Sequence, residues 1–385
     1  MKRYKLKELS LSKLEYGSGA AACEYDGKTR YVRITDIDNE GNLGTDVVSP
    51  NSVDDKYLLN DGDVLFARTG ATVGKTYLYR SSAGRCIYAG FLIRVVPNQE
   101  IIRPDYLYYF TKSPQYKGFI QSSMKVVAQP NINAKQYGDL EFNVPSLEEQ
   151  DLIIKKLNAI SSAIILRRTE LIRLDELIKA RFVEMFGGVF EYDKQLLSEN
   201  VEEMFIGPFG SALKNECFVD KENSYCMVYE QKHAIQKTMN VPTRYIDEEK
   251  YEELKRFTVY GGDIIVSCRG TIGEVFLVPD TAPIGIMHPS IMKIRLKTDK
   301  YRNLFFAYML EQFMRESIKK ANGSGIKMAI TAKELGKEVF IIPTLEKQAE
   351  FELFVNQINK SKVAVQAALD KAQLLFDSLM QEYFG

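Results

Sequence analysis

A 43-residue segment occurs twice in this chain, and no other feature of the sequence constrains the fold as strongly. The segment runs from Pro145 to Gly187 and again, 198 residues later, from Pro343 to Gly385, and the copies align without a gap. Both copies open on Pro-x-Leu-Glu-x-Gln and close on Phe-Gly. An internal repeat defines the structural unit before any local prediction is made. We therefore expect the chain to be built twice.

Apolar residues recur along each copy in alternating steps of four and three, which is typical of the heptad seam of a coiled coil. Each copy follows a proline, carries acidic residues in its first turn and ends at a glycine, as helices often do. Helices of roughly 35–40 residues are about 55–60 Å long, too long for one small core to cover, so we expect them to pair antiparallel. The predicted seam residues are Ile153, Leu157, Ile160, Ile164, Leu171, Leu174 and Ile178, and then Phe351, Val355, Ile358, Val365, Leu369, Phe376 and Leu379. Two unrelated amphipathic helices would not explain the second copy.

Two charged residues interrupt this seam, Arg167 in the first helix and Lys362 in the second. In an antiparallel pair with flush ends, Arg167 is expected near Val363 and Lys362 near Arg168, at the centre of the pair. Burying two like charges there would destabilise the pair, so we expect both side chains to extend outward to solvent. The functional alternative is that they fix the register or contact partner subunits.

The remaining sequence falls into two stretches of similar plan. Short β-rich runs separated by Gly, Asn and Asp turns predict strands at 30–34, 64–66, 76–79 and 91–96, followed by a helix at 104–110. Gly62–Gly70 corresponds to Gly262–Gly270, and Ile132–Lys135 corresponds to Ile330–Lys333. We therefore predict an α+β chain with an internal pseudo-twofold repeat. Its parts are two similar mixed α/β domains, at 1–143 and 188–342, and two long helices, at 144–187 and 343–385, which form an antiparallel coiled coil.

Composition narrows the functional classes. The chain has 51 basic and 51 acidic residues, so a nucleic-acid surface would need local clustering of charge or partner subunits. Five cysteines without a C-x-x-C pair indicate reduced thiols and argue against a zinc site. The sequence has no signal peptide and no apolar run of membrane-spanning length, so we expect a cytoplasmic protein.

Enzymatic motifs are weak throughout the sequence. Gly70–Thr76 looks like a phosphate-binding loop but is one residue short, and its duplicate at Gly270–Val275 lacks the lysine and threonine. The only histidines, His233 and His288, have no cysteine or acidic pair at ligand spacing nearby. We expect His233 to be an ordinary polar loop residue. No motif for amino-methylation of a base is present. We therefore expect no catalytic residue, no metal and no cofactor in this chain.

Taken in order, these pieces resemble the specificity subunit of type I restriction–modification systems, over essentially the whole chain. Gln129–Asn133, Gly207–Ser211 and Tyr229–Ile235 add to the resemblance, whereas Lys327–Ile330 departs from its counterpart Gln129–Ile132. The resemblance implies two target-recognition domains that each read half of a split DNA sequence. It also implies that the helices fix the gap between half-sites and dock two methyltransferase subunits, and that restriction/translocase subunits join them. S-adenosylmethionine, ATP and Mg would then belong to the partner subunits.

DNA-contacting residues are expected among basic, amide and hydroxyl side chains in turns, because these groups bind phosphates and base edges. The candidates are Arg68, Thr69, Lys75, Lys125, Gln129 and Asn131 in the first domain, and Ser211, Lys214, Arg269, Thr271 and Lys327 in the second. Taken singly, each could equally be a solvated turn residue. A second functional class also stays open, that of a coiled-coil interaction scaffold whose two globular domains bind proteins or other ligands.

Overall fold

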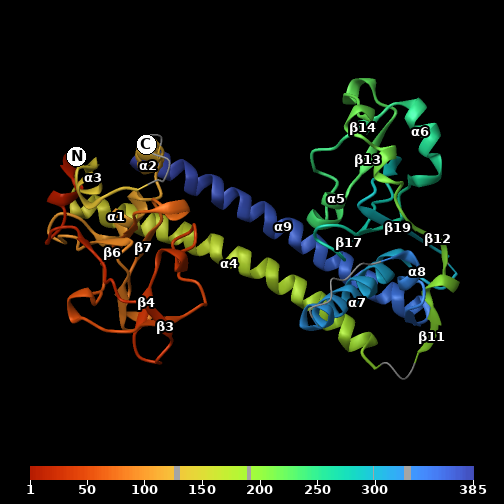
Figure 1. Cartoon of the computed structure of the whole chain (residues 1–385), viewed down its shortest axis with the longest axis horizontal. Helices are drawn as coiled ribbons and strands as arrows, with labels where there is room; N and C mark the ends of the chain where they lie inside the picture. Colours follow the sequence, from red (N-terminus) through yellow and green to blue (C-terminus); the bar gives the residue numbers. More distant parts are fainter. Residues whose placement is uncertain (125–130, 189–191, 298, 325–330) are drawn as a thin grey trace. The chain divides into compact units, whose positions relative to one another are not determined.

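The computed structural model describes residues 1–124, 131–188, 192–297, 299–324 and 331–385. Contacts divide the chain into two units (Figure 1). Unit 1 comprises Met1–Leu171 and Ala364–Gly385, and unit 2 comprises Ile172–Val363. Each long helix therefore contributes one part to each unit, which the order of domains along the sequence did not reveal.

The two long helices are α4 (Leu147–Phe186) and α9 (Leu345–Phe384), each of 40 residues. In unit 1 the Nζ atom of Lys156 donates to the hydroxyl of Tyr383 at 3.0 Å, so the early part of α4 lies beside the end of α9. In unit 2 Arg181 pairs with Glu350 at 2.7 Å, so the end of α4 lies beside the start of α9. The helices pack antiparallel, as the repeat predicts.

Burial along the helices follows the predicted seam closely. The buried members are Ile153, Leu157, Ile164, Ile178, Phe351, Val355, Ile358, Val365 and Leu369. The half-buried members are Ile160, Leu171, Leu174, Phe376 and Leu379.

The two charged seam residues reach solvent in different ways. Arg167 is exposed and pairs with Glu170 on its own helix at 2.7 Å. Lys362 is half-buried and pairs with Asp175 at 2.7 Å. The flush-register prediction expected Lys362 near Arg168 and did not identify Asp175 as its ion-pair partner. A long, flexible ammonium side chain extends along the helix to a carboxylate, since a second cation would repel it.

Unit 1 is built on a four-stranded antiparallel sheet in the order β2-β9-β6-β7 (Figure 1). Its strands are β2 (Glu15–Tyr16), β6 (Val64–Ala67), β7 (Thr76–Leu78) and β9 (Leu92–Val95). Three pairs join it: β1 (Lys2–Lys5) with β10 (Glu141–Val144), β3 (Ala22–Glu24) with β5 (Val48–Pro50), and β4 (Arg30–Val32) with β8 (Cys86–Tyr88), the last one parallel. The helices of this part are α1 (Pro104–Phe110), α2 (Pro114–Met124) and α3 (Ala134–Gly138).

Both faces of this sheet are covered. Val64 and Phe66 pack on the side of the helices, in the core that also holds Leu157 of α4. Leu65 and Ala67 point to the opposite side, because successive side chains of a strand alternate between faces. With its faces buried, the sheet offers its strand ends and connecting loops to the surroundings.

Unit 2 repeats this plan with the sheet order β12-β19-β16-β17 (Figure 1). These strands are β12 (Val201–Ile206), β16 (Ile264–Ser267), β17 (Val275–Leu277) and β19 (Ile291–Leu296). A second sheet has the order β14 (Tyr245–Ile246), β13 (Cys226–Tyr229), β18 (Gly285–Met287) and β15 (Thr258–Val259), and β11 (Asp193–Leu196) pairs with β20 (Val339–Ile342). The helices are α5 (Gln231–Gln236), α6 (Glu248–Leu254), α7 (Asn303–Ser324) and α8 (Ala332–Leu335). The shared strand order confirms the predicted α+β internal repeat.

The repeated glutamine of the Pro-x-Leu-Glu-x-Gln motif ties each long helix to the loop before α1 or α7. The side chain of Gln150 is fully buried and donates to the carbonyls of Ile101 and Pro145, both at 2.9 Å. Its Oε1 accepts from the backbone N–H of Arg103 at 2.8 Å. Gln348 makes the corresponding bonds in unit 2, including one from the N–H of Arg302 at 2.8 Å. The motif is therefore structural.

Within the described ranges, no helix has both the length and the apolar character needed to cross a membrane.

Candidate nucleic-acid interface

Three loops meet at one end of the unit 1 sheet. The loop after β2 is held to the β8–β9 connection because the N–H of Gly17 donates to the carbonyl of Leu92 at 3.1 Å. In return, the N–H of Gly90 donates to the carbonyl of Ser18 at 2.8 Å. The loop after β6 joins them because the N–H of Arg68 donates to the carbonyl of Phe91 at 3.1 Å. We name residues 17–20, 68–71 and 89–91 the unit 1 edge.

Arg68 is the best-positioned cation of the unit 1 edge. Its guanidinium carbon lies 4.6 Å from the ring centroid of Tyr16, and its Nε donates to Oδ1 of Asn131 at 3.4 Å. The backbone of Thr69 forms a bridge with Asn131. The structure thus brings together three predicted residues that are as far as 63 positions apart. Stacking fixes the planar guanidinium, and Arg and Asn are the side chains that read base edges by paired hydrogen bonds.

Lys75, another predicted residue of the first domain, does not join this group. The Nζ of Lys75 donates to the carbonyl of Ile37 at 3.0 Å, which turns this half-buried side chain towards the neighbouring loop. Lys125 and Gln129 lie outside the described residues. Gly70 and Gly74 have positive φ angles of 67° and 85°, and the strand β7 follows them directly. The segment is therefore a turn between strands, whereas a phosphate-binding loop requires a helix there.

Unit 2 has an equivalent set of loops. The N–H of Gly207 donates to the carbonyl of Ile291 at 3.0 Å, and the N–H of Cys268 donates to the carbonyl of Ser290 at 2.8 Å. Both Gly17 and Gly207 are required here, because a Cβ atom at either position would overlap the backbone oxygen of Ala89 or His288. We name residues 207–214, 268–271 and 288–290 the unit 2 edge.

The unit 2 edge carries four of the predicted DNA-contacting residues, all of them exposed. Ser211 and Lys214 lie on the loop after β12, and Arg269 and Thr271 lie on the loop after β16. Arg269 follows Cys268 directly, so it adjoins the connection that holds Ser290. Lys327 lies outside the described residues. The two edges therefore share a backbone frame and differ in their side chains.

The two histidines of the chain lie in unit 2 and accept hydrogen bonds from its backbone. His288 is half-buried, and its Nδ1 accepts from the backbone N–H of Ser290 at 3.2 Å within the unit 2 edge. His233 is fully buried on α5, and its Nδ1 accepts from the N–H of Glu230 at 3.0 Å. Burial lowers the pKa of both imidazoles, which favours their neutral form. The prediction that His233 is a polar loop residue is wrong, because its ring closes the first turn of a helix.

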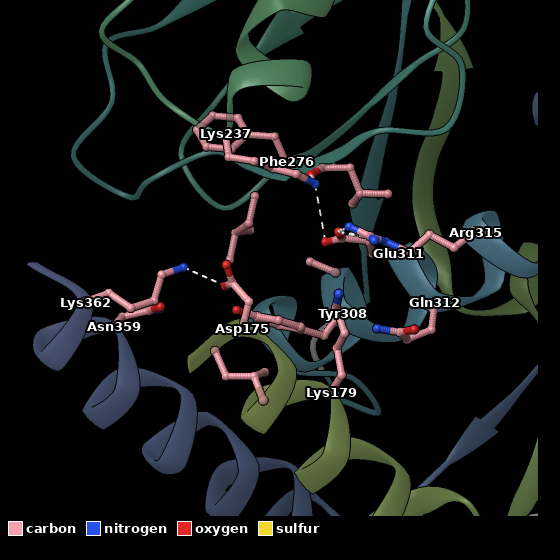
Figure 2. Close-up of a pocket in the computed structure, with 14 residues that line it drawn as sticks. Asp175, Lys179, Lys237, Phe276, Tyr308, Glu311, Gln312, Arg315, Asn359 and Lys362 are labelled. Atoms are coloured by element: carbon pink, nitrogen blue, oxygen red, sulfur yellow. Dashed lines mark hydrogen bonds and ion pairs between the residues drawn. The ribbon is translucent and has the colours of Figure 1, made fainter. Parts of the chain in front are cut away.

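A pocket of about 470 Å³ in unit 2 is held together by ion pairs. Figure 2 shows Lys362 facing Asp175, and Lys237 directed at Glu311 of α7. These pairs measure 2.7 Å and 3.3 Å, and Arg315 also pairs with Glu311 at 2.6 Å. These pairs join α4 to α9, and α7 to Lys237 at the end of α5. Among the residues that the structure covers, no cluster of three His, Cys, Asp or Glu side chains could hold a metal ion.

Three aromatic residues, in or next to the two edges, do not follow from the sequence patterns. Tyr16 supports Arg68, and the rings of Phe91 and Phe209 are exposed. Their neighbours give the only signal that could have found them, because Gly90 precedes Phe91 and Phe209 lies in the run Gly-Pro-Phe-Gly. A ring flanked by glycine in a turn has few neighbours to cover it.

Comparison with known proteins identifies the family. The family described as type I restriction modification DNA specificity domain matches the chain twice, at residues 4–176 and 199–369. A Methanocaldococcus jannaschii protein assigned as the type I restriction enzyme MjaX specificity subunit is 26% identical over 332 residues, covering 82% of this chain and 77% of that protein.

Two solved structures share the fold. One chain comes from a structure concerned with complex assembly and conformational transition of the type I R-M system. It is 18% identical with a TM-score of 0.62, and the match covers 100% of this chain and 97% of that one. The type I restriction–modification S subunit from M. genitalium is 13% identical with a TM-score of 0.59, covering 100% and 96%. Because the family match spans both repeats, the chain belongs to the type I restriction modification DNA specificity domain family.

Proposed function

We propose that this chain is the DNA-recognition subunit of a type I restriction–modification complex and reads a bipartite target. The observation that carries the proposal is the recurrence of one loop frame, the edge of each unit, with different side chains in the two copies. Sharing a frame allows both units to approach DNA in the same way. Differing in side chains allows them to read different half-sites, because base edges are distinguished by the groups that bond them.

The recognition domains are, in this proposal, residues 1–143 and 188–342. Arg68 and Asn131 supply base-reading groups in the first domain, with Thr69 beside them. Arg269 takes this part in the second domain, and Ser211, Thr271 and Lys214 are suited to phosphate contacts. Arginine binds guanine through two parallel hydrogen bonds, and asparagine binds adenine in the same way. Lys75, Lys125, Gln129 and Lys327 remain candidates for contacts to the DNA backbone or bases.

The long helices, at 144–187 and 343–385, are proposed to set the separation of the half-sites and to dock two methyltransferase subunits. Several large apolar side chains on them stay exposed in the described chain, among them Leu166 at 68%, Leu353 at 71% and Leu374 at 72%. Exposed apolar side chains along a helix are suited to packing against further helices. Restriction/translocase subunits would complete the complex, and S-adenosylmethionine, ATP and Mg would be bound by those partners. The chain itself then acts without catalysing a reaction.

The alternative hypothesis is a coiled-coil scaffold whose globular domains bind proteins or other ligands. It is not favoured, because the matching family is one of DNA specificity domains and the match includes both globular domains.

Mapping methylated adenines in cells with and without this chain, alongside its methyltransferase partner, tests the proposal. One bipartite motif should be methylated only when the chain is present. Purified complex should bind that motif with an affinity that falls steeply with salt and depends on both half-sites. Methylation that is independent of the chain would overturn the proposal.

Single substitutions then test which residues of the two edges contact DNA. Arg68→Ala should weaken binding by about 1–3 kcal/mol and relax one base position of one half-site, and Arg269→Ala should do so in the other half-site. Arg85→Ala is the matched control, because Arg85 is an exposed arginine that pairs with Asp55 outside the edge. Unchanged specificity in both edge variants would remove the residue assignments and leave the function of the chain intact.

A further inference from the structure

Two phenylalanines stand apart from the others in the described chain. Phe91 is 58% exposed and Phe209 is 90% exposed, and every other phenylalanine in the described ranges is at least partly covered. A single exposed apolar side chain needs no explanation, since folded proteins have many. Here, however, one exposed ring lies in the unit 1 edge and the other in the unit 2 edge. Because both rings lie at the edges, we infer that they are exposed for the same reason.

The two rings come from different segments of the same frame. In unit 1 the N–H of Leu92 donates to the carbonyl of Ala89 at 2.9 Å, which closes the turn that carries Phe91. In unit 2 the N–H of Ile291 donates to the carbonyl of His288 at 3.1 Å, and Ser290 takes the position of Phe91 in this turn.

The neighbouring loop shows the converse exchange. Phe209 lies two residues after Gly207, and the residue two after Gly17 in unit 1 is Gly19. Each edge thus holds one phenylalanine. The exposed phenylalanine lies on the β8–β9 connection in unit 1 and on the loop after β12 in unit 2. In both units this loop belongs to the edge.

We propose that Phe91 and Phe209 are wedge residues that insert into the base stack of duplex DNA, one in each half-site. The proposal rests on the proposed DNA-recognition function. Proteins that deform DNA use phenylalanine in this way, since an apolar ring replaces one base in the stack and opens the adjoining step. An exposed ring at a turn reaches beyond the backbone around it, as such insertion requires.

The surroundings of both rings suit close contact with DNA. A Cβ atom added at Gly19 or at Gly210 would meet nothing within 4 Å, so each edge has backbone that is open to an approaching strand. The backbone N–H of Arg68 donates to the carbonyl of Phe91. Arg269 directly follows Cys268, whose N–H donates to the carbonyl of Ser290. Each edge thus also carries an arginine, which can neutralise a phosphate of the bound DNA.

Insertion would also serve the reaction of the partner subunits. A methyltransferase must take its target base out of the helix before it can react, and the lost stacking opposes that step. A wedge in the same half-site unstacks one step in advance, which lowers the remaining cost of extrusion. In this arrangement, the specificity subunit prepares the base in addition to selecting it.

The test uses the chain in complex with its methyltransferase subunits, without S-adenosylmethionine, and duplexes carrying the mapped target. 2-Aminopurine, which fluoresces when it is unstacked, replaces one base at a time across each half-site. The wild-type complex should raise fluorescence at the inserted step of both half-sites. Phe91→Ala should abolish the rise in one half-site and Phe209→Ala in the other, and each should weaken binding about tenfold, as loss of one base–aromatic contact does.

Two further variants complete the design. Phe209→Leu keeps an apolar wedge and should retain part of the fluorescence rise. Val339→Ala removes an exposed apolar side chain of unit 2, 53% exposed on β20, and should leave fluorescence and binding unchanged.

Three results bear on the proposal in different ways. Alanine variants that bind and unstack DNA like the wild type would overturn the wedge role and leave the DNA-recognition function standing. Alanine variants that no longer assemble with the methyltransferase subunits in size-exclusion chromatography would assign the rings to a protein interface, which also overturns it. A wild-type complex that binds no specific sequence would remove the proposed function itself.

Discussion

The Nδ1 atom of His288 accepts a hydrogen bond from the backbone N–H of Ser290 at 3.2 Å, and His233 caps the N–H of Glu230 in the same way at 3.0 Å. Each of these bonds needs an unprotonated Nδ1, whereas the carbonyl of Glu230, 3.1 Å from the Nδ1 of His233, raises the pKa of that ring. Burial lowers the pKa of both rings, and Arg244 lowers that of His288 further although Glu230 opposes it. Unit 1 contains no histidine, so this dependence on a neutral ring belongs to unit 2 alone.

We predict that unit 2 loses stability as the pH falls below the pKa of an unfolded histidine, about 6.5. Below that value the unfolded chain binds protons that the folded imidazoles exclude, so protonation favours unfolding. The stabilisation is complete above pH 6.5 and declines towards the lowered folded pKa. Urea unfolding followed by circular dichroism at pH 7.5 and 6.0 measures it, since the chain has no tryptophan.

The matched variant for this prediction is the double substitution His233→Gln with His288→Asn, which keeps polar acceptors and removes both titrating groups. Its stability should vary less between the two pH values than that of the wild type. An equal loss in the double variant would assign the pH dependence to carboxyl groups and contradict the prediction.

The buried glutamine of the repeated motif gives a second prediction. Gln150→Ala removes the acceptor of the Arg103 N–H and the donor to two carbonyls, in a place that solvent does not reach. A buried donor left without a partner costs roughly 1–3 kcal/mol, so the free energy of unfolding should fall by about that amount. Gln348→Ala should have a similar effect. Gln366→Ala is the control, because Gln366 is exposed on α9 and bonds Asp370 one turn away. Equal losses in all three variants would contradict the assigned role.

Burial along α4 supplies a third prediction. Leu157 is fully buried in the unit 1 core beside Met380 and Phe384, whereas Leu152, five residues earlier, is 62% exposed. Leu157→Ala should lower the free energy of unfolding by about 2–5 kcal/mol, because it leaves a cavity between packed side chains. Leu152→Ala should change it by less than about 0.5 kcal/mol. A comparable loss at Leu152 would indicate that another protein surface covers this side of α4.

Periodicity made the long helices predictable, because a seam kept over 40 residues and repeated without a gap has one common interpretation. The helix Pro104–Phe110 also followed from local signals, and the structure has it at these residues. The ion-pair partner of Lys362 could not be predicted, because its flexible side chain can reach several carboxylates and the heptad pattern does not indicate which one it contacts. The burial of His233 does not follow from the sequence either, because a hydrogen bond to the backbone can hold a polar ring in the interior.

The residue types at the candidate interface could be predicted from the sequence, whereas their arrangement in space could be predicted only in part. Turn position and residue type pointed to Arg68, Thr69 and Asn131, and the fold brings them together. The same criteria also selected Lys75, which turns to the carbonyl of Ile37 instead. Neither criterion could identify Phe91 or Phe209, because an aromatic residue is usually buried and exposure depends on which loops meet at the sheet end.

The length of the long helices gives a final prediction. Inserting one heptad into both α4 and α9 adds about 10.5 Å to each helix and keeps the seam in phase, since seven residues complete two turns. If the helices set the separation of the half-sites, the methylated motif should gain up to about three base pairs between its two halves, at about 3.4 Å per base pair. A heptad inserted into α4 alone should shift its seam against that of α9 and lower stability without producing a new motif. Mapping methylated adenines for both variants measures this, and an unchanged spacer in a stable double-insertion variant would show that the separation is set elsewhere.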